Sequence, residues 1–251
     1  MNKFSSRLVA HRGYMELYPE NSWRGLKAAL DKGANWIEFD IQMYQPGQFV
    51  LLHDADFQRT ANTPLPLFEL TEAELQQISI HEPGRLGERF APEPIVSLEE
   101  VLIRLGDYPS AHAMVEIKEE SLDYWGLEAV MHSLLPIISR FKTQCVLISF
   151  SLDALRYSRN HSDLETGWVL RRYDAQSLIL AAELNPEYLI CNYTKLPPNK
   201  KPLAGEWRWM IYDITDPELA LQWMKLDVDL VETRDIGRLI SYLNSPTDTG
   251  H

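Results

Sequence analysis

Glu38 and Asp40 are two acidic residues separated by one apolar residue inside the otherwise apolar run 36–41. Successive side chains of a β-strand point to opposite faces, so a strand here would place both carboxylates on one face. Two unpaired carboxylates in a partly dry cavity repel each other unless a cation lies between them. The spacing therefore predicts that Glu38 and Asp40 hold a divalent cation. Ligation by oxygen alone favours Mg²⁺ or Ca²⁺ over zinc.

Two further strand-like runs end in polar side chains. Glu116 and Lys118 show the same alternation in the run 112–118, and the first apolar run of the chain ends in His11 and Arg12. Glu116 would supply a third carboxylate to a hard-metal site. The histidine, the arginine and the lysine could then exchange protons and bind an anion beside the metal.

The runs 35–41 and 48–53 are separated only by a Pro-Gly turn signal. A parallel crossover needs about a dozen residues, so the two runs are predicted to form an antiparallel hairpin. With the turn centred near residues 45 and 46, His53 lies opposite Glu38 and joins the same cavity. Asp54 then points away or curls back to orient the imidazole.

These side chains can meet only if the strands that carry them lie side by side. Short apolar runs alternate with amphipathic helical segments along the chain, a pattern typical of a parallel sheet covered by helices. The predicted strands are 7–11, 35–41, 48–53, 112–118, 145–150, 165–170, 187–192, 208–214 and 228–233. Without the returning hairpin strand, eight remain, so the predicted fold is α/β, a (β/α)8 TIM-type barrel. Barrel active sites form at the carboxyl ends of the strands, where all of these polar residues fall.

The connections carry further signals. Asn21 is a candidate N-cap for a helix that ends at Gly33, and apolar spacing predicts another helix over 122–138. The segment of about 54–111 is rich in proline and turn-forming residues, and it is predicted to be an inserted lid or flap. The chain as a whole, 1–251, is predicted to be a single barrel domain.

Each polar residue also has a structural interpretation. A Glu-x-Asp pair is often a solvated sheet face, a histidine at a strand end is often a hydrogen-bonded structural residue, and Arg12 or Lys118 could pair with surface acids. Structural ion pairs have no reason to gather on one barrel rim, however, so their convergence favours a catalytic site.

Composition excludes several classes of protein. The chain has 251 residues and a formal net charge of −12, without a run of basic residues, which disfavours a nucleic-acid partner. No apolar stretch approaches the ~20 residues of a membrane span, so no stable membrane insertion is expected, and the predicted location is cytoplasmic. The oligomeric state is not predicted.

Five short motifs follow one another along the chain. They are His11-Arg12-Gly13, Pro19-Glu20-Asn21-Ser22, Glu38-Phe39-Asp40, His53-Asp54 and Glu116-Ile117-Lys118. In order and spacing this set resembles the glycerophosphodiester phosphodiesterase family, and weaker similarity extends over about residues 8 to 240. Each motif is common alone, whereas the set is specific.

The resemblance implies a barrel and one divalent cation, Mg²⁺ or Ca²⁺, held by Glu38, Asp40 and Glu116. It also implies His11 and His53 as the acid/base pair. Arg12 and Lys118 match the family's phosphate contacts, and the implied partner is a small glycerophosphodiester that is hydrolysed to sn-glycerol 3-phosphate and an alcohol.

Two strand ends, 212–215 and 231–234, depart from the family pattern. They are expected to shape the pocket around the alcohol without touching the metal or the histidines. Two other functions stay open. One is a lysophospholipase D or sphingomyelinase D type activity on lipids, which needs an exposed apolar rim such as 65–68. The other is a barrel that binds a metabolite without catalysis.

Overall fold

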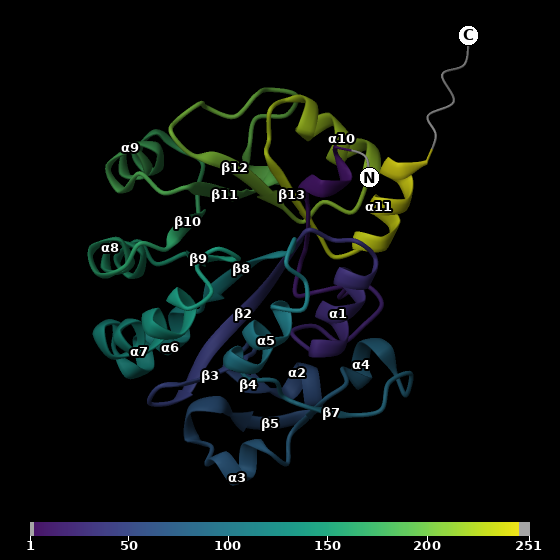
Figure 1. Cartoon of the computed structure of the whole chain (residues 1–251), viewed down its shortest axis with the longest axis vertical. Coiled ribbons are helices and arrows are strands. Elements are labelled where there is room, and N and C mark those ends of the chain that lie inside the picture. Colours follow the sequence, from purple (N-terminus) through teal and green to yellow (C-terminus); the bar gives the residue numbers. More distant parts are fainter. Residues whose placement is uncertain (1–2, 246–251) are drawn as a thin grey trace.

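Eight parallel strands close into a barrel in this computed structural model, which describes residues 3–245 (Figure 1). In barrel order they are β1 (Leu8–Ala10), β2 (Trp36–Gln45), β8 (His112–Ile117), β9 (Cys145–Ser149), β10 (Glu165–Leu170), β11 (Tyr188–Asn192), β12 (Arg208–Tyr212) and β13 (Leu230–Thr233). The barrel closes because β1 pairs in parallel with both β2 and β13. The predicted (β/α)8 fold is therefore confirmed.

A layer of helices covers the outside of the barrel. It consists of α1 (Trp23–Asp31), α5 (Leu98–Leu105), α6 (Glu119–Trp125), α7 (Leu127–Ser139), α8 (Leu152–His161), α9 (Ala175–Leu184), α10 (Pro217–Lys225) and α11 (Ile236–Asn244). The helix predicted over 122–138 is two helices, because Gly126 adopts φ 85° between α6 and α7. Short 3₁₀ turns span Ser5–Arg7, Leu67–Glu69 and Tyr193–Lys195.

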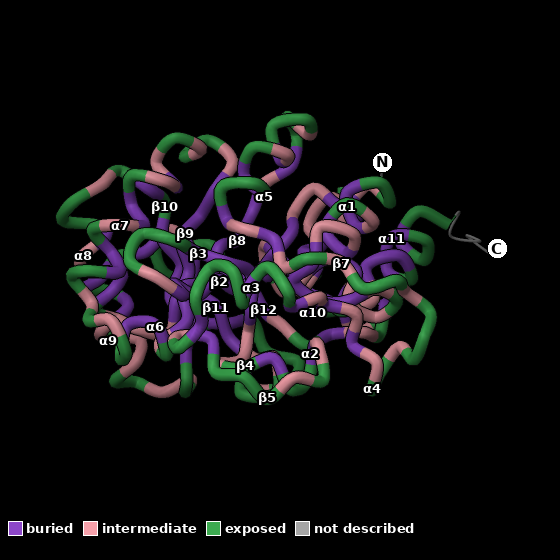
Figure 2. The backbone as a smooth tube through the Cα atoms, turned by 90° about the horizontal axis from the view of Figure 1, so that it is seen from below, coloured by how far each residue is buried: buried purple, intermediate pink, exposed green. Residues whose placement is uncertain are grey.

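Apolar side chains form two separate layers around the strands. Ile37, Phe39 and Ile41 of β2 face outward into the core that the helices cover, as the alternation predicts. A smaller cluster fills the barrel interior, consisting of Val9, Met114, Val146, Ile148, Val169, Tyr188, Ile190, Met210 and Leu230. Figure 2 shows the buried segments in the middle of the molecule and the exposed ones mainly around its edge. The interior is thus a packed plug, and it leaves room for a site only at the mouth.

Strand β3 (Gln48–Leu51) returns antiparallel to β2, so the predicted hairpin is confirmed. The predicted register is wrong by one position. Gln45 pairs with Gln48, so the turn is centred at 46–47 rather than near 45 and 46, and Ile41 pairs with Leu51. His53 therefore lies beyond the end of β3 rather than across the ladder from Glu38.

The segment after the hairpin builds small elements of its own. They are β4 (Asp56–Phe57), α2 (Gln58–Ala61), β5 (Thr63–Pro66), α3 (Glu72–Leu75), β6 (Ser79–Ile80), α4 (Pro83–Leu86) and β7 (Glu93–Pro94). Phe57, Leu67, Leu75 and Ile80 are buried in a local core together with Leu52 of the hairpin side. Helix α5, although it falls inside the predicted range of about 54–111, packs instead into the main core through its apolar face. Among the described residues, no helix is long and apolar enough to cross a membrane.

Candidate active site

The carboxyl ends of β1 and β8, and the part of β2 that pairs with β8, open into one cavity of about 180 Å³, called here the mouth cavity. All seven residues predicted for the site line it: His11, Arg12, Glu38, Asp40, His53, Glu116 and Lys118. Strands β2 and β8 pair in parallel with Asp40 beside Glu116, which brings two of the acids together. The cavity floor is apolar and includes Ile148, Ile190 and Met210 of the barrel interior.

Three carboxylates crowd one side of the mouth cavity. Glu38, Asp40 and Glu116 each offer an oxygen atom, and these atoms all lie within 4.8 Å of one another. The three residues are at most 9% exposed. Burial, followed by repulsion from Asp40, raises the pKa of Glu116 and raises that of Glu38 well above its ordinary value. Buried oxygen donors at this spacing fit a hard divalent cation.

Two basic side chains compensate part of this negative charge. Arg12 Nε lies 3.0 Å from Asp40 Oδ2, and Lys118 Nζ lies 3.5 Å from Asp40 Oδ1 and 2.9 Å from Glu116 Oε1. Burial alone would raise the pKa of Asp40, but Arg12 and Lys118 outweigh it and hold that pKa well below its usual range. The two predicted phosphate contacts thus lie directly beside two of the predicted metal ligands.

A strained turn after β1 sets the position of Arg12. Arg12 and Gly13 both have positive φ, 51° and 81°. A Cβ on Gly13 would lie 2.6 Å from the carbonyl carbon of Gly25, so α1 can approach the turn only because residue 13 is glycine. The turn directs the Arg12 backbone N–H to Glu38 Oε2, at 2.9 Å.

Asn21 has a different role from the one predicted. Ser22 caps α1 by accepting a hydrogen bond from the Gly25 N–H. The Asn21 side chain instead donates to Asp40 Oδ2 at 2.9 Å and accepts from the Asp40 backbone N–H at 3.0 Å. Asn21 therefore fixes the orientation of a predicted metal ligand.

The two histidines lie in different surroundings. His11 Nε2 is 3.9 Å from Glu38 Oε2, and burial, with Arg12 as the next cause, lowers the pKa of His11 to about 3. His53 is more exposed, and its Nδ1 lies 2.7 Å from Asp54 Oδ1. Asp54 therefore curls back onto the imidazole, one of the two orientations that the sequence left open.

A chain of ion pairs connects His53 to Arg12 around the rim. Arg59 Nε donates to Asp54 Oδ2 at 2.8 Å, and the same guanidinium donates two hydrogen bonds, of 2.6 and 2.7 Å, to Glu20. Glu20 also accepts from Arg12 Nη1 at 2.9 Å. Burial opposes ionisation of Glu20, but the hydrogen bonds from Arg59 and the charge of Arg12 prevail and lower its pKa.

The inserted segment is attached to this rim through a buried acid. Glu82 accepts hydrogen bonds from the Glu20 backbone N–H and from Arg85 Nε. Arg85 in turn donates to the carbonyls of Met15 and Tyr18 in the loop that precedes α1. The loop that carries Glu20 and Asn21 is therefore held between the barrel and the insertion.

Sequence reasoning missed two acids that line the mouth cavity, Asp213 and Glu232. Asp213 is exposed, whereas Glu232 is 4% exposed and has a ligand atom within 4.8 Å of those of His11 and Glu38. The expectation that 231–234 stays away from the metal ligands and the histidines is therefore wrong. The signal was present, because strand alternation from Leu230 in the barrel interior places Glu232 on the same inward face. Glu20 and Arg59 also received no individual role from the sequence, and Asn21 was predicted only as a helix cap.

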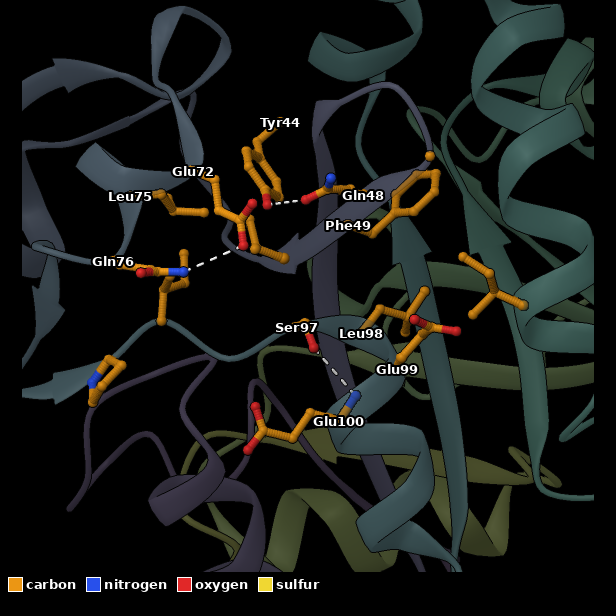
Figure 3. A pocket seen from close by; sticks show the side chains of 15 residues that line it. Tyr44, Gln48, Phe49, Glu72, Leu75, Gln76, Ser97, Leu98, Glu99 and Glu100 are labelled. Carbon is orange, nitrogen blue, oxygen red and sulfur yellow. Dashed lines mark hydrogen bonds between the residues drawn. The ribbon is translucent and has the colours of Figure 1, made fainter.

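A larger hollow of about 520 Å³, called here the outer hollow, lies between the hairpin, α3 and the start of α5. Figure 3 shows Tyr44 and Gln48 of the hairpin on one side and Ser97 to Glu100 on the other. None of the seven predicted site residues lines it.

Comparison with known proteins points to one family. A model of the glycerophosphoryl diester phosphodiesterase family matches residues 11–190. A glycerophosphodiester phosphodiesterase of Caldanaerobacter subterraneus is 31% identical over 149 residues, which is 59% of this chain and 60% of that protein. One of Bacillus altitudinis is 32% identical over 127 residues, 49% of each chain. The chain thus spans about half to three-fifths of these relatives.

Solved structures share the fold over nearly the whole chain. A phosphodiesterase of Oleispira antarctica in complex with the product sn-glycerol-3-phosphate superposes with a TM-score of 0.83, at 21% identity, over 95% of this chain and 97% of that one. A glycerophosphodiester phosphodiesterase of Agrobacterium tumefaciens gives a TM-score of 0.74 at 20% identity, over 94% and 99%.

Proposed function

Because the chain belongs to the glycerophosphoryl diester phosphodiesterase family, we propose that it hydrolyses glycerophosphodiesters to sn-glycerol 3-phosphate and an alcohol. The observation that carries this proposal is the meeting of three buried carboxylates, two histidines and two basic side chains in the mouth cavity. The relatives named as phosphodiesterases support the same reaction, as does the product bound in the Oleispira antarctica structure.

Glu38, Asp40 and Glu116 would hold one divalent cation. Their donor set fits it, since all three offer oxygen and crowd one another while buried. Such a donor set favours Mg²⁺ or Ca²⁺. When bound, the cation would polarise the phosphodiester and stabilise the charge that builds up in the transition state.

Arg12 and Lys118 would contact the phosphate. Both project into the mouth cavity, and each is fixed by acids, Arg12 by Glu20 and Asp40 and Lys118 by Asp40 and Glu116. Basic groups fixed in advance stabilise developing negative charge without having to reorganise. The net charge of −12 makes such local compensation necessary for an anionic substrate.

His11 and His53 would carry the proton transfers. The contact with Asp54 holds His53 Nδ1 and fixes the orientation of the ring, which favours His53 as the group that accepts a proton from the attacking hydroxyl or water. His11 would then protonate the departing alkoxide, and the approach of an anionic phosphodiester favours the charged form that this step requires.

The lipid-directed alternative needs an apolar rim. Of the segment 65–68, Leu67 is fully buried in the core of the insertion and Phe68 stacks on Tyr124 at a centroid distance of 4.6 Å. Only Leu65 and Pro66 are exposed, which is a short anchor for a lipid chain. We therefore prefer a water-soluble glycerophosphodiester as the substrate. The cytoplasmic location stays a prediction.

The test is product analysis by ³¹P NMR. The chain is incubated with glycerophosphocholine or lysophosphatidylcholine, with Mg²⁺, with Ca²⁺ and with chelator. The proposal expects sn-glycerol 3-phosphate from glycerophosphocholine and no product in chelator. Turnover of lysophosphatidylcholine alone would favour the lipid enzyme. Binding of sn-glycerol 3-phosphate without hydrolysis under any condition would favour a metabolite-binding barrel.

A further inference from the structure

Glu232 is a buried acid that the proposed reaction does not use. It lies near the end of β13, is 4% exposed and lines the mouth cavity. Within residues 3–245 its carboxylate has no hydrogen-bond or ion-pair partner. An isolated buried carboxylate is strongly unfavourable, so such a group needs a cation or a proton.

The basic side chains of the cavity already contact acids other than Glu232. Arg12 and Lys118 contact Asp40 and Glu116. Glu38 receives a single backbone N–H, that of Arg12, and no contact from a lysine or arginine side chain among the described residues. Among the buried acids of the cavity, Glu38 and Glu232 are therefore the two without a lysine or arginine partner in the described residues.

A nitrogen donor stands beside these two acids. Ligand atoms of His11, Glu38 and Glu232 all lie within 4.8 Å of one another, and His11 Nε2 is 3.9 Å from Glu38 Oε2. Two ligands on one zinc ion, each about 2.1 Å from it, lie at most about 4.2 Å apart, so small side-chain movements close this triad around a single ion. The triad shares Glu38 with the three-carboxylate cluster but uses a different set of partners.

We propose that the mouth cavity contains a second divalent-cation position, formed by His11, Glu38 and Glu232, which takes Zn²⁺. Its mixed nitrogen and oxygen donors suit zinc, whereas the three carboxylates of Glu38, Asp40 and Glu116 suit Mg²⁺ or Ca²⁺. Glu38 can serve both positions with its two oxygen atoms, an arrangement common in sites where two metals lie about 3.5–4 Å apart.

The second position has a consequence for activity that rests on the proposed function. A zinc ion on His11 Nε2 occupies the lone pair through which His11 exchanges a proton with substrate. Zinc therefore inhibits hydrolysis supported by magnesium, and Glu232 is the residue that makes the protein sensitive to it.

The binding test uses the full chain stripped of metal and titrated with ZnCl₂ alone or MgCl₂ alone, with bound ions counted by equilibrium dialysis. The parent is expected to bind one more zinc ion per chain than Glu232→Gln, or to bind it at least about tenfold more tightly, with equal magnesium binding. Glu206→Gln, which removes an exposed acid, is the matched control and is expected to behave as the parent. Equal zinc stoichiometry and affinity in the parent and Glu232→Gln would overturn the proposal.

A measurement on the parent removes any dependence on how the variant folds. Crystals soaked in zinc are examined by anomalous scattering at the zinc absorption edge. A peak between His11, Glu38 and Glu232 supports the proposal. Zinc confined to Glu38, Asp40 and Glu116, or bound only elsewhere, refutes it.

Activity measurements distinguish a failure of the zinc-site proposal from a failure of the proposed function. With glycerophosphocholine and magnesium, added zinc should inhibit the parent at least about tenfold more strongly than Glu232→Gln. If no variant hydrolyses the diester, the proposed function fails, while zinc counting and the anomalous map still decide whether the second position exists.

Discussion

The mouth cavity and the outer hollow both contain clustered acids, but only one arrangement resembles a reaction centre. The outer hollow is the larger, about 520 Å³ against 180 Å³. Its Glu72, Glu99 and Glu100 are exposed residues in the first turns of α3 and α5, where acids are favoured by the helix dipole. Glu99 pairs with Arg140 at 3.2 Å and Glu100 with Arg104. These acids have structural explanations.

The acids of the mouth cavity lack such an explanation. They are buried, they crowd one another, and their basic partners compensate only part of their charge. The comparison teaches that burial and crowding of like charges, rather than cavity size, mark the place where a cation and an anionic substrate would be stabilised.

The largest expected effect comes from removing a metal ligand in the mouth cavity. Glu38→Gln keeps the shape of the side chain but removes the negative charge of one of the three predicted metal ligands. The rate of hydrolysis should therefore fall by about 10³-fold or more. The thermal stabilisation that Mg²⁺ or Ca²⁺ gives the parent should disappear as well. Retention of both activity and metal-induced stabilisation, measured by kinetics and by thermal melts, would remove Glu38 from the ligand set.

A smaller effect is expected at the rim. Asp54→Asn leaves His53 without its carboxylate partner, so kcat should fall by about 10²-fold while KM changes little. Asp56→Asn is the matched control, because Asp56 is exposed and, among the described residues, its carboxylate accepts a hydrogen bond only from the Gln58 N–H. Equal kcat in the two variants would show that Asp54 does not position the imidazole.

The thermal stability of the metal-free protein, measured in chelator, tests the crowding of the carboxylates in the mouth cavity directly. Since the folded pKa of Glu38 is raised above the unfolded value, the folded state binds more protons, and its stability falls as pH rises between the two values. Glu38→Gln removes this loss. Without metal it should melt a few degrees above the parent at about pH 8, and the gap should shrink as pH falls toward about 4.5, the ordinary carboxyl range. A parent whose melting temperature does not depend on pH in this range would contradict the direction of the pKa shift.

The smallest effect is expected in the outer hollow. Glu99→Gln removes an exposed ion pair with Arg140, which contributes at most about 1 kcal/mol. Hydrolysis should stay within about twofold of the parent. A loss of tenfold or more would mean that the outer hollow takes part in the reaction.

The strand pattern predicted the barrel and the seven residues that meet at its mouth, because period-two alternation and strand-end position are local properties. Two features depended on details that the pattern does not contain. The hairpin turn is centred one residue later than expected, which moves the register, and the Asn21 side chain contacts Asp40 instead of capping a helix. The Arg59–Glu20 contact joins residues 39 apart through the folded insertion, so no spacing rule predicts it.

Glu232 marks a different limit. Its inward direction could be predicted from Leu230, but its proximity to His11 depends on closure of the barrel between β1 and β13. That closure places residue 232 beside residue 9 in register. The departure from the family pattern at 231–234 therefore places a carboxylate next to the histidine, beyond any effect on the pocket around the alcohol.

The most direct test of the central claim is the rate of His53→Ala on glycerophosphocholine with Mg²⁺ or Ca²⁺, measured against the parent. His53 reaches the mouth cavity from outside the barrel strands, so its participation shows that the separate pieces form one centre. The account predicts a loss of about 10² to 10⁴ in kcat with the fold and metal-induced stabilisation retained. Activity within about threefold of the parent would contradict it.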